Sequence, residues 1–312
     1  MFLLGGHSVC RRYHNLDHVD HNKTMVDMLR WMRERRKKVK DLSNPIPHAE
    51  EKMKEHIHLN KTKTSYTWIG HSTFLLQING LNILTDPVFG RRMGFQKRLT
   101  APGLEIHELP RIDIVVISHG HYDHLEFPSL KMLKGDPTFY VPAGLKPLFQ
   151  KQGLYKVIEA NWWDRLQYDS LSISFVPAQH WTRRNLFDMN TSHWGGWVFE
   201  TGEQTFYFVG DTGYFRGFQE IGRRFDINTV FMPIGAYEPE WFMNISHINP
   251  EDSIKAYMDL GAKTFVPMHY GAYRLADDTG PEALQRLYNE WERLNLPKDK
   301  LRVHKIGETC WT

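Results

Sequence analysis

Four side chains that can bind a metal lie within one short loop, Ser118–His124. They are His119, His121, Asp123 and His124. Neutral imidazole nitrogens and carboxylate oxygens are ligands of zinc, and a catalytic zinc ion keeps one coordination position open for water. No cysteine lies near the loop, which excludes a structural thiolate site. The same residues would also suit a polar surface loop of a soluble protein, but this density of donors favours a metal site.

The loop follows an apolar, β-branched run, Ile112–Ile117, which predicts a buried strand. Open α/β sheets bind their ligands beyond the carboxyl ends of strands, so this strand would present the loop at such an edge. His119 and His121 occupy alternate positions and can converge on one cation, while Asp123 and His124 turn toward a second position beside it. The spacing therefore predicts that one loop serves two metals.

One loop cannot complete two coordination shells, and further donors follow other predicted strands. The pairs of strand and donor are Leu171–Val176 with His180, Thr205–Val209 with Asp211, and Lys263–Pro267 with His269. We expect these donors to meet the loop at the same edge of the fold.

The order of these motifs resembles that of the metallo-β-lactamase fold hydrolases. Within this group, additional segments resemble N-acylphosphatidylethanolamine-hydrolysing phospholipase D. The segments are Thr67–Thr73, Leu84–Phe89, Asn161–Asp164, Gln179–Trp181, Gly210–Tyr214, Pro233–Pro239, Trp241–Met243 and His247–Glu251. The resemblance runs from about Tyr66 to the C-terminus.

The resemblance implies an α/β (α+β) fold, a four-layer αβ/βα sandwich of the metallo-β-lactamase type. Two mixed sheets would pack back to back, with helices outside and the metals at one edge. The sequence itself predicts a hairpin turn at Asn79–Gly80. Helices are expected at Pro128–Leu133, Leu145–Gln152, Pro250–Leu260 and Pro281–Leu294.

The resemblance also implies two Zn²⁺ per chain and assigns their ligands. The first zinc would be held by His119, His121 and His180, the second by Asp123, His124 and His269, with Asp211 bridging. Two zinc ions that share a hydroxide would stabilise both the attacking and the leaving oxygen in a displacement at phosphorus.

Catalytic roles are expected for Asp211 and Asp123 through the metals and for His247 at the substrate. His247 would contact the phosphate or protonate the leaving alkoxide; the alternative is that it caps the helix that follows. Ser246 stands where animal members of the family carry a longer amide side chain, so headgroup recognition would differ here. Candidate substrate contacts are Tyr122, Trp181, Tyr237 and Ser246.

Two polar residues near the motifs are expected to support the ligands and not to bind metal. His71 is predicted to hydrogen-bond a ligand, because the two coordination shells are already complete. Asp86 is predicted to accept the proton of a ligand histidine or to cap backbone amides.

Composition agrees with one large domain and an extension. The chain has 312 residues, of which 41% are hydrophobic and 24% charged. We divide it into an N-terminal extension, residues 1–60, and a hydrolase domain, residues 61–312. No stretch approaches the roughly 18 to 20 apolar residues of a membrane span. Met1–Gly6 lacks a signal-peptide pattern, and only Cys10 and Cys310 occur, so a cytoplasmic location is expected.

The extension contains a basic amphipathic segment from Thr24 to Lys40. Met25, Met28, Leu29 and Met32 share one helical face, and a basic cluster follows them. This segment could lie peripherally on an anionic membrane, or it could pack on the domain with a solvated charged face. A net charge of +3 gives no support to nucleic-acid binding.

Together these features predict a zinc-dependent phosphodiesterase of phospholipase D type. It would hydrolyse N-acylphosphatidylethanolamine to phosphatidic acid and N-acylethanolamine through a hydroxide that bridges the two zinc ions. One alternative is a dizinc hydrolase of another phosphodiester or of a lactone, because fold does not fix substrate. A second is a non-catalytic metal-binding or membrane-docking protein, which the complete ligand set disfavours. The resemblance also implies a homodimer.

Overall fold

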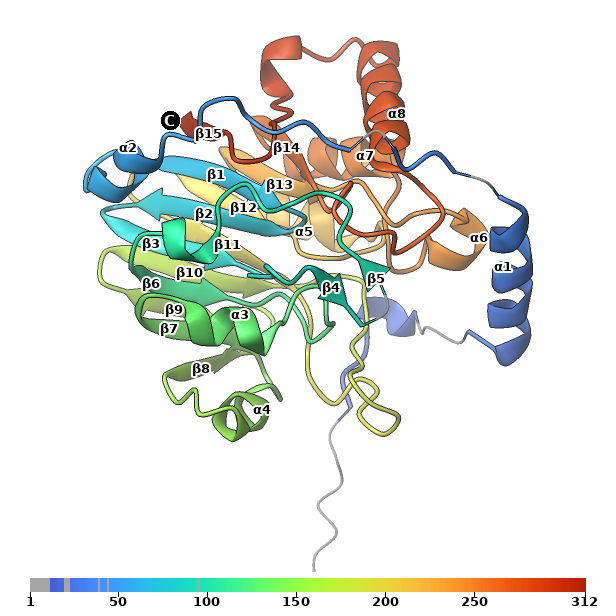
Figure 1. Ribbon diagram of the computed structural model, residues 1–312, viewed down its shortest axis with the longest axis horizontal. Coiled ribbons are helices and arrows are strands. Elements are labelled where there is room, and N and C mark those ends of the chain that lie inside the picture. The colour runs from blue at the N-terminus through green and yellow to red at the C-terminus, as the bar shows by residue number, and fades with distance from the viewer. Residues whose placement is uncertain (1–11, 20–22, 39, 44, 95) are drawn as a thin grey trace, which may run out of the picture.

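A computed structural model describes residues 12–19, 23–38, 40–43, 45–94 and 96–312. Met1–Gly6 and Cys10, on which sequence predictions rest, lie outside these ranges. Two β-sheets form the centre of the molecule, one of seven strands and one of six (Figure 1). A separate two-stranded ribbon joins β4 and β5.

The strands are β1 Ser65–Gly70, β2 Thr73–Ile78, β3 Leu81–Thr85, β4 Arg92–Met93, β5 Gln96–Lys97, β6 Ile112–Val116, β7 Gly135–Pro142, β8 Val157–Ala160, β9 Arg165–Tyr168, β10 Leu171–Val176, β11 Gly196–Glu200, β12 Thr205–Phe208, β13 Thr229–Pro233, β14 Thr264–Met268 and β15 Thr309–Trp311. The α-helices are α1 Met25–Lys37, α2 Lys54–Leu59, α3 Phe127–Met132, α4 Lys146–Lys151, α5 Gly217–Arg224, α6 Glu240–Met243, α7 Pro250–Leu260 and α8 Gly280–Arg293. Short 3-10 turns occur at Leu16–His18, Ile106–Glu108 and Lys298–Lys300.

The seven-stranded sheet has the order β15-β1-β2-β3-β6-β7-β8. Its first four strands pair antiparallel, whereas β3, β6, β7 and β8 run parallel. The predicted hairpin turn between β2 and β3 is present, with φ of 52° at Asn79 and 78° at Gly80. Asparagine followed by glycine tolerates these left-handed angles, which match the twist of the flanking strands.

The six-stranded sheet has the order β14-β13-β12-β11-β10-β9. Here β12, β13 and β14 are parallel, and β9 to β12 pair antiparallel. Both sheets are therefore mixed. Because β10, β12 and β14 run in the same direction, the segments that follow them leave the sheet at one edge.

Successive side chains along each strand point to opposite faces of the sheet, and this divides the core into two layers. Phe74 of β2 and Phe175 and Trp197 of the other sheet belong to one cluster of buried residues between the sheets. Leu75, the neighbour of Phe74, points to the opposite side and packs in a second cluster with Phe149 of α4. Successive strand residues face opposite sides of a sheet, so strands covered on both faces are apolar throughout.

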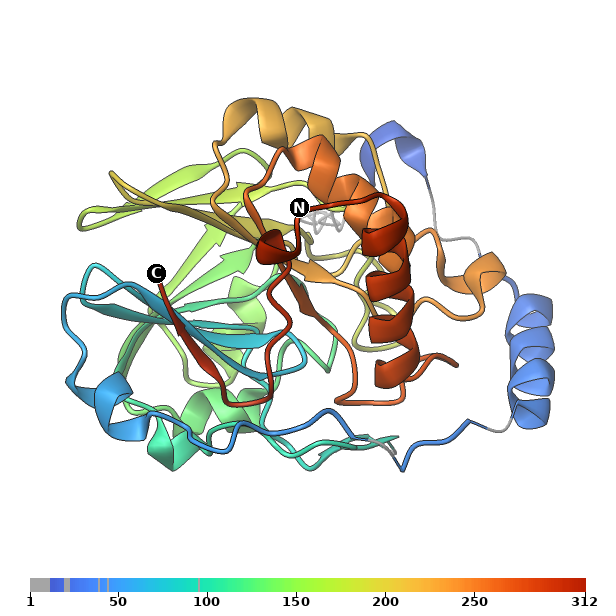
Figure 2. The same cartoon turned by 90° about the horizontal axis from the view of Figure 1, so that it is seen from above.

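Helices cover the outer face of each sheet. Contacts join α5 to α7, α7 to α8, and α7 to β13 of the six-stranded sheet. In Figure 2 these gold, orange and red helices lie on one side of the two sheets, and the blue α2 and green α3 lie on the other. The predicted four-layer sandwich is confirmed.

The N-terminal segment runs across the domain surface. Figure 1 places α1 at one side of the molecule and α2 at the other. Between them, Ile46 is buried and His48 pairs with Ile306 in a parallel bridge. The division at residue 60 stays a prediction. Among the described residues, no helix is both long and apolar enough to cross a bilayer.

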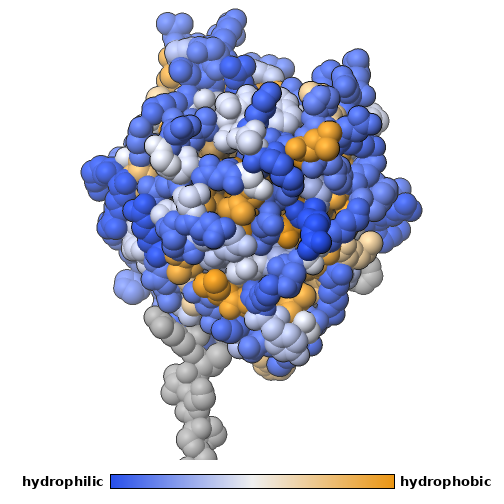
Figure 3. Space-filling view, turned by 90° about the vertical axis from the view of Figure 1, so that its left-hand side faces the viewer, coloured by the Kyte–Doolittle hydropathy of each residue, from blue (hydrophilic) through white to orange (hydrophobic). Residues whose placement is uncertain are grey.

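Figure 3 shows the face of the molecule that carries α2. This face is mainly hydrophilic, and its apolar groups are small and separate. Leu59 of α2 is a strongly exposed apolar side chain, 78% accessible. Scattered apolar residues of this kind are ordinary on protein surfaces.

Candidate metal centre

Three histidines from two loops form the first group of donors. His119 Nε2 lies 2.9 Å from His121 Nδ1, and His180 Nε2 lies 3.1 Å from the same atom. Zinc bonds of 2.0–2.1 Å in a tetrahedron place neighbouring nitrogens roughly 3.3 Å apart. The three nitrogens thus converge at about the spacing that one zinc ion requires.

The second group combines carboxylates with two histidines. Asp211 Oδ1 is 3.2 Å from His124 Nε2 and 3.1 Å from His269 Nε2. Asp123 Oδ2 is 3.3 Å from His124 Nε2 and 3.5 Å from His269 Nε2. The other oxygen of Asp211, Oδ2, lies 3.9 Å from His180 Nε2. Asp211 therefore faces both groups, as a bridging ligand must.

The hydrogen bonding of the second group fits a metal site. His124 Nε2, His269 Nε2 and Asp211 Oδ1 are buried and have no hydrogen-bond partner among the described residues. Buried polar atoms are normally satisfied, so three such atoms pointing at each other require a further group between them. A divalent cation meets this need, and nitrogen and carboxylate oxygen are suitable ligands for zinc.

The sheets account for this convergence. The loop with His119 follows β6, Asp211 follows β12, His269 follows β14, and His180 lies beyond β10. All leave their strands at carboxyl ends along one edge of the sandwich. Gly120 is needed in the loop because a Cβ there would come within 2.6 Å of Thr182 Oγ1.

Asp86 and Ser118 orient the rings of His124 and His119 through the ring nitrogens that do not face the metal positions. Asp86 Oδ2 accepts a hydrogen bond from His124 Nδ1 at 2.6 Å, and Asp86 Oδ1 accepts one from the Ser118 amide at 2.7 Å. Ser118 Oγ also contacts His119 Nδ1 at 2.9 Å. Partners of this kind fix the tautomer and ring orientation of a ligand histidine. Asp86 thus makes both contacts that the sequence predicted for it.

His71 also lies in the cluster. Its Nε2 is 3.1 Å from Asp123 Oδ2, the type of contact predicted for a supporting residue, and its donor atoms fall within the second group. His71, Asp86 and His269 have positive φ angles of 55°, 34° and 61°. A non-glycine residue in this region costs about 1–3 kcal/mol, and such strain is concentrated at functional sites.

Electrostatics keep the first group of histidines and the carboxylates in the forms that bind metals. Burial lowers the pKa values of His124 and His269, but the carboxylates outweigh burial. They raise the pKa of His124 well above its usual value and that of His269 to about 9, so these two imidazoles would release a proton when a metal binds. Burial raises the pKa of Asp211, but His124 and His269 outweigh burial and hold this pKa well below its usual value. Burial lowers the pKa of His119 well below its usual range and that of His121 to about 4. The first group therefore offers neutral imidazoles, and the second offers ionised carboxylates.

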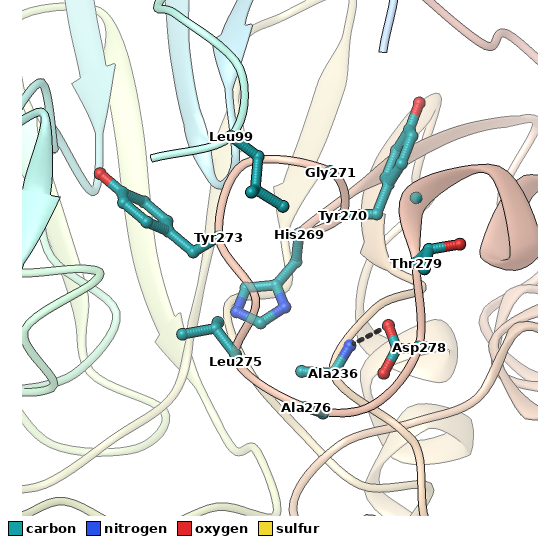
Figure 4. A pocket seen from close by; sticks show the side chains of 11 residues that line it. Leu99, Ala236, His269, Tyr270, Gly271, Tyr273, Leu275, Ala276, Asp278 and Thr279 are labelled. Atoms are coloured by element: carbon teal, nitrogen blue, oxygen red, sulfur yellow. Dashed lines mark hydrogen bonds between the residues drawn. The ribbon is translucent and has the colours of Figure 1, made fainter. Parts of the chain in front are cut away.

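A small cavity lies behind His269. It has a volume of about 20 Å³ and is lined by Ala236, Tyr273 and Leu275 among others. Figure 4 shows the His269 imidazole at the centre of these residues, with Asp278 accepting a hydrogen bond from the Ala236 amide at 2.9 Å. His269 Nδ1 is buried and has no hydrogen-bond partner among the described residues. The cavity is large enough for one water molecule, which would be a suitable acceptor for this N–H.

His247 lies beside the bridging aspartate. Its Nδ1 is 3.7 Å from Asp211 Oδ2, and its ring centroid is 5.2 Å from that of His180. The N-cap of α7 is Asn249, whose Oδ1 accepts a hydrogen bond from the Asp252 amide at 2.8 Å. The helix-capping alternative for His247 is therefore wrong, and the side chain is free for another role.

The candidate substrate residues occupy different places. The Trp181 ring centroid is 4.5 Å from that of His121, and Tyr122 is 54% exposed with its hydroxyl donating to the Arg184 carbonyl. Ser246 is buried, and its carbonyl accepts a hydrogen bond from His180 Nδ1 at 2.9 Å. Tyr237 lies apart from these residues, buried beneath the guanidinium of Arg286. The structure therefore places Trp181, Tyr122 and Ser246 next to ligands.

Sequence reasoning missed Asn15, which clamps a ligand from the N-terminal segment. Asn15 Nδ2 donates to the His180 carbonyl at 2.9 Å, and Asn15 Oδ1 accepts from the His180 amide at 3.0 Å. Trp194 Nε1 donates to the same oxygen at 2.9 Å. Asn15 is 7% exposed. A lone asparagine so far from the motifs gives no local signal in the sequence.

Arg184 was also missed. Its Nη1 donates to the Gly120 carbonyl at 2.7 Å and to the Leu125 carbonyl at 3.0 Å, and its guanidinium covers the Tyr122 ring at 4.0 Å. Arg184 thus ties the segment after His180 to the metal-binding loop.

Comparison with known proteins identifies the family. A family model described as the Beta-lactamase superfamily domain matches residues 81–270, which include every predicted metal ligand. The chain belongs to this superfamily. The site is therefore that of a metal-dependent hydrolase with the metallo-β-lactamase fold.

Two relatives of this superfamily member are named for a phospholipase D activity. The chain is 35% identical over 257 residues to N-acyl-phosphatidylethanolamine-hydrolyzing phospholipase D 1 of Caenorhabditis elegans, covering 76% of this chain and 68% of that protein. A second relative is the Saccharomyces cerevisiae protein named N-acyl-phosphatidylethanolamine-hydrolyzing phospholipase D, mitochondrial. The two chains are 35% identical over 260 residues, which cover 78% of this chain and 55% of the yeast protein. The chain therefore spans little more than half of the yeast relative.

Solved structures share the fold. The metallo hydrolase Igni18 of Ignicoccus hospitalis superposes with a TM-score of 0.62 at 24% identity, covering 80% of this chain and 99% of that one. At this identity the likeness concerns the fold of the superfamily and not its substrates.

Proposed function

We propose that the protein is a dizinc phosphodiesterase of phospholipase D type. It would hydrolyse N-acylphosphatidylethanolamine to phosphatidic acid and N-acylethanolamine. The observation that carries the proposal is the pair of donor groups joined by Asp211 in a chain 35% identical to a nematode phospholipase D. The donor set supports two metals, and the relative supports the substrate class.

His119, His121 and His180 would hold one zinc ion, and Asp123, His124 and His269 the other, with Asp211 between them. When bound, such a pair supplies Lewis acidity to the phosphoryl oxygens and lowers the pKa of a water molecule toward neutrality. The chain provides the remaining requirements: Asp86 and Ser118 keep the ligand rings oriented, and burial of the ligands excludes bulk water.

His247 is the residue assigned to the substrate. Burial lowers its pKa to about 4, so its neutral ring can donate one hydrogen bond and accept another. In the reaction the oxygen of water forms a bond to phosphorus, and the bond from phosphorus to the ethanolamine oxygen breaks. The departing oxygen takes a proton and leaves as N-acylethanolamine. His247 would hydrogen-bond this oxygen or a phosphoryl oxygen.

Mass spectrometry of the products tests the proposal. Zinc-loaded protein is incubated with bilayers that contain N-acylphosphatidylethanolamine, beside the Asp211→Asn variant. We expect phosphatidic acid and N-acylethanolamine from the native protein and a rate lower by orders of magnitude from the variant, because amide substitution weakens the link between the two groups. Asp226→Asn is the matched control, since Asp226 is exposed and pairs with Lys263.

Two results would overturn the proposal. Native-like turnover by Asp211→Asn with full zinc content would contradict the metal mechanism. Cleavage of soluble phosphodiesters or lactones in the absence of lipid cleavage would retain the hydrolase and exclude the proposed substrate.

A further inference from the structure

An exposed apolar loop tip lies close to the metal centre. Phe187 is 86% exposed and Leu186 is 76% exposed, and Phe187 has the highest exposure of the large apolar side chains in the described part of the chain. Exposed phenylalanine and leucine side by side are costly in water. Beside a site proposed to take a lipid substrate, such exposed side chains could contact the bilayer that holds the substrate.

The tip is ordered by its own hydrogen bonds. Asp188 Oδ1 accepts from the amides of Arg184 and Asn185 at 2.9 and 2.8 Å, and Asn185 Oδ1 accepts from the Phe187 amide at 2.8 Å. Arg184 then joins the base of the loop to the carbonyls of the metal-binding loop. The apolar tip is thus held in a fixed position relative to His121.

The outer face of α1 is a second exposed apolar surface. Met25, Val26 and Leu29 are 74%, 73% and 56% exposed. The inner face of the helix is anchored, because the Trp31 ring stacks on Phe242 at 4.9 Å and its Nε1 donates to Asp277 at 3.2 Å. The anchoring fixes which residues face outward.

The charges of α1 are divided between these faces. Its acidic residues are engaged: Asp27 in the capping box with Thr24, and Glu34 with Arg30 and Trp241. The exposed charged residues near the carboxyl end are cations, Arg33, Arg36 and Lys37. Helical periodicity places these cations on the same side as Met25 and Leu29.

A basic groove continues this surface. It has a volume of about 440 Å³ and is lined by Met32, Arg35, Arg36, Lys38 and Arg274. Asp277 pairs with Arg35 at 3.4 Å and with Lys38 at 3.8 Å, and Glu238 pairs with Lys38 at 2.9 Å. The four cations of the groove thus outnumber these two carboxylates, and Arg36 and Arg274 account for the excess of positive charge. Arg274 Nε is buried and has no hydrogen-bond partner among the described residues. These features suit a phosphate group.

Both apolar surfaces adjoin segments of the metal centre. The inner face of α1 contacts Phe242 of α6, and α6 leads directly to Ser246 and His247. The loop tip is joined to the metal-binding loop through Arg184. In Figure 1, α1 lies on the side of the molecule away from α2, so the outer face of α1 is distinct from the hydrophilic face of Figure 3.

We infer that Leu186, Phe187, the outer face of α1 and the basic groove form a docking surface for a bilayer that contains anionic phospholipid. The apolar side chains would enter the interfacial region while the cations contact lipid phosphates. The inference rests on the proposed function in one respect: the docking surface would bring the proposed lipid substrate to the metals.

Vesicle co-sedimentation of the full chain tests the docking surface. The vesicles are phosphatidylcholine alone or mixed with phosphatidylglycerol. We expect the native protein to prefer the anionic vesicles, and Leu186→Ser/Phe187→Ser and Met25→Ser/Leu29→Ser each to reduce this binding at least tenfold. Arg36→Gln/Lys37→Gln should remove the preference for the anionic lipid. Leu59→Ser is the matched control, because Leu59 is equally exposed on α2, and its binding should not change.

Turnover of a water-soluble phosphodiester shows whether each variant is folded. A second measurement needs no loss of function: Phe187→Trp should show a blue-shifted emission on vesicles and quenching by brominated lipid acyl chains. Native-like vesicle binding by both apolar variants, or no quenching of Phe187→Trp, would overturn the inference. So would a change of oligomeric state without a change in vesicle binding, which would assign the surface to contacts between copies.

The outcome is separate from that of the proposed function, because binding is measured without catalysis. Vesicle binding without lipid cleavage would reject the proposed substrate alone. Lipid cleavage in detergent without vesicle binding would reject the docking surface alone.

Discussion

His247 is proposed to act on the substrate and not to bind metal. It lies 3.7 Å from Asp211 but outside both donor groups of the two-metal assignment. We predict that His247→Asn lowers kcat by about 10²–10⁴-fold, the usual contribution of a proton-transferring or charge-stabilising side chain. Zinc content, measured by elemental analysis, should be unchanged. Loss of zinc in this variant would instead show that His247 is a ligand.

Asn15 is a positioning residue that acts through the backbone of His180. Removing its side chain would take away the acceptor of the His180 amide and one of the two acceptors of the Trp194 indole, which would keep its contact with the Ala178 carbonyl at 3.1 Å. We predict that Asn15→Ala weakens zinc binding at the first group by about tenfold, the lower end of the effect of supporting contacts. Competition with a chelator measures this affinity.

The control for this prediction is Asp17→Ala. Asp17 is near Asn15 in sequence but forms an exposed ion pair with Arg216. This variant should keep the native zinc affinity. Equal losses in both variants would show that the N-terminal segment as a whole, and not Asn15, supports the site.

At the scale of elements, Asn249 determines where α7 begins. Its side chain caps the helix, and Pro250 follows in the first turn. We predict that Asn249→Ala lowers the free energy of unfolding by about 1 kcal/mol, with Asn249→Ser close to native, as measured by chemical denaturation. An unchanged stability in Asn249→Ala would show that the cap is not a stabilising contact.

Elements with strong local signals were predicted well. The helix predicted at Pro250–Leu260 has those bounds in the structure, because an asparagine cap, a proline and a terminal glycine mark its ends. The helix predicted at Pro281–Leu294 shifts by one residue to Gly280–Arg293. The helices α2, α5 and α6 were missed. α6 has only four residues, and α2 and α5 lack a side-chain cap that would mark where they begin.

At the scale of the whole molecule, the metal-binding loop could be predicted from the sequence, but the distant residues that hold the ligands in place could not. The spacing of His119, His121 and His124 follows directly from the sequence. The contacts of Asn15 with His180 and of Arg184 with Gly120 join residues that are distant along the chain. Such contacts depend on how the sheets and the N-terminal segment pack, and no single local pattern contains that information.

The central claim is that the donor groups on one edge of the sandwich direct water to the phosphorus of N-acylphosphatidylethanolamine. Hydrolysis in water labelled with heavy oxygen tests it most directly, with mass spectrometry of both products. Phosphatidic acid incubated with the protein in the same water controls for exchange. We predict one labelled oxygen in the phosphate of phosphatidic acid and none in N-acylethanolamine. Label in N-acylethanolamine, or release of a fatty acid in place of these products, would contradict the account.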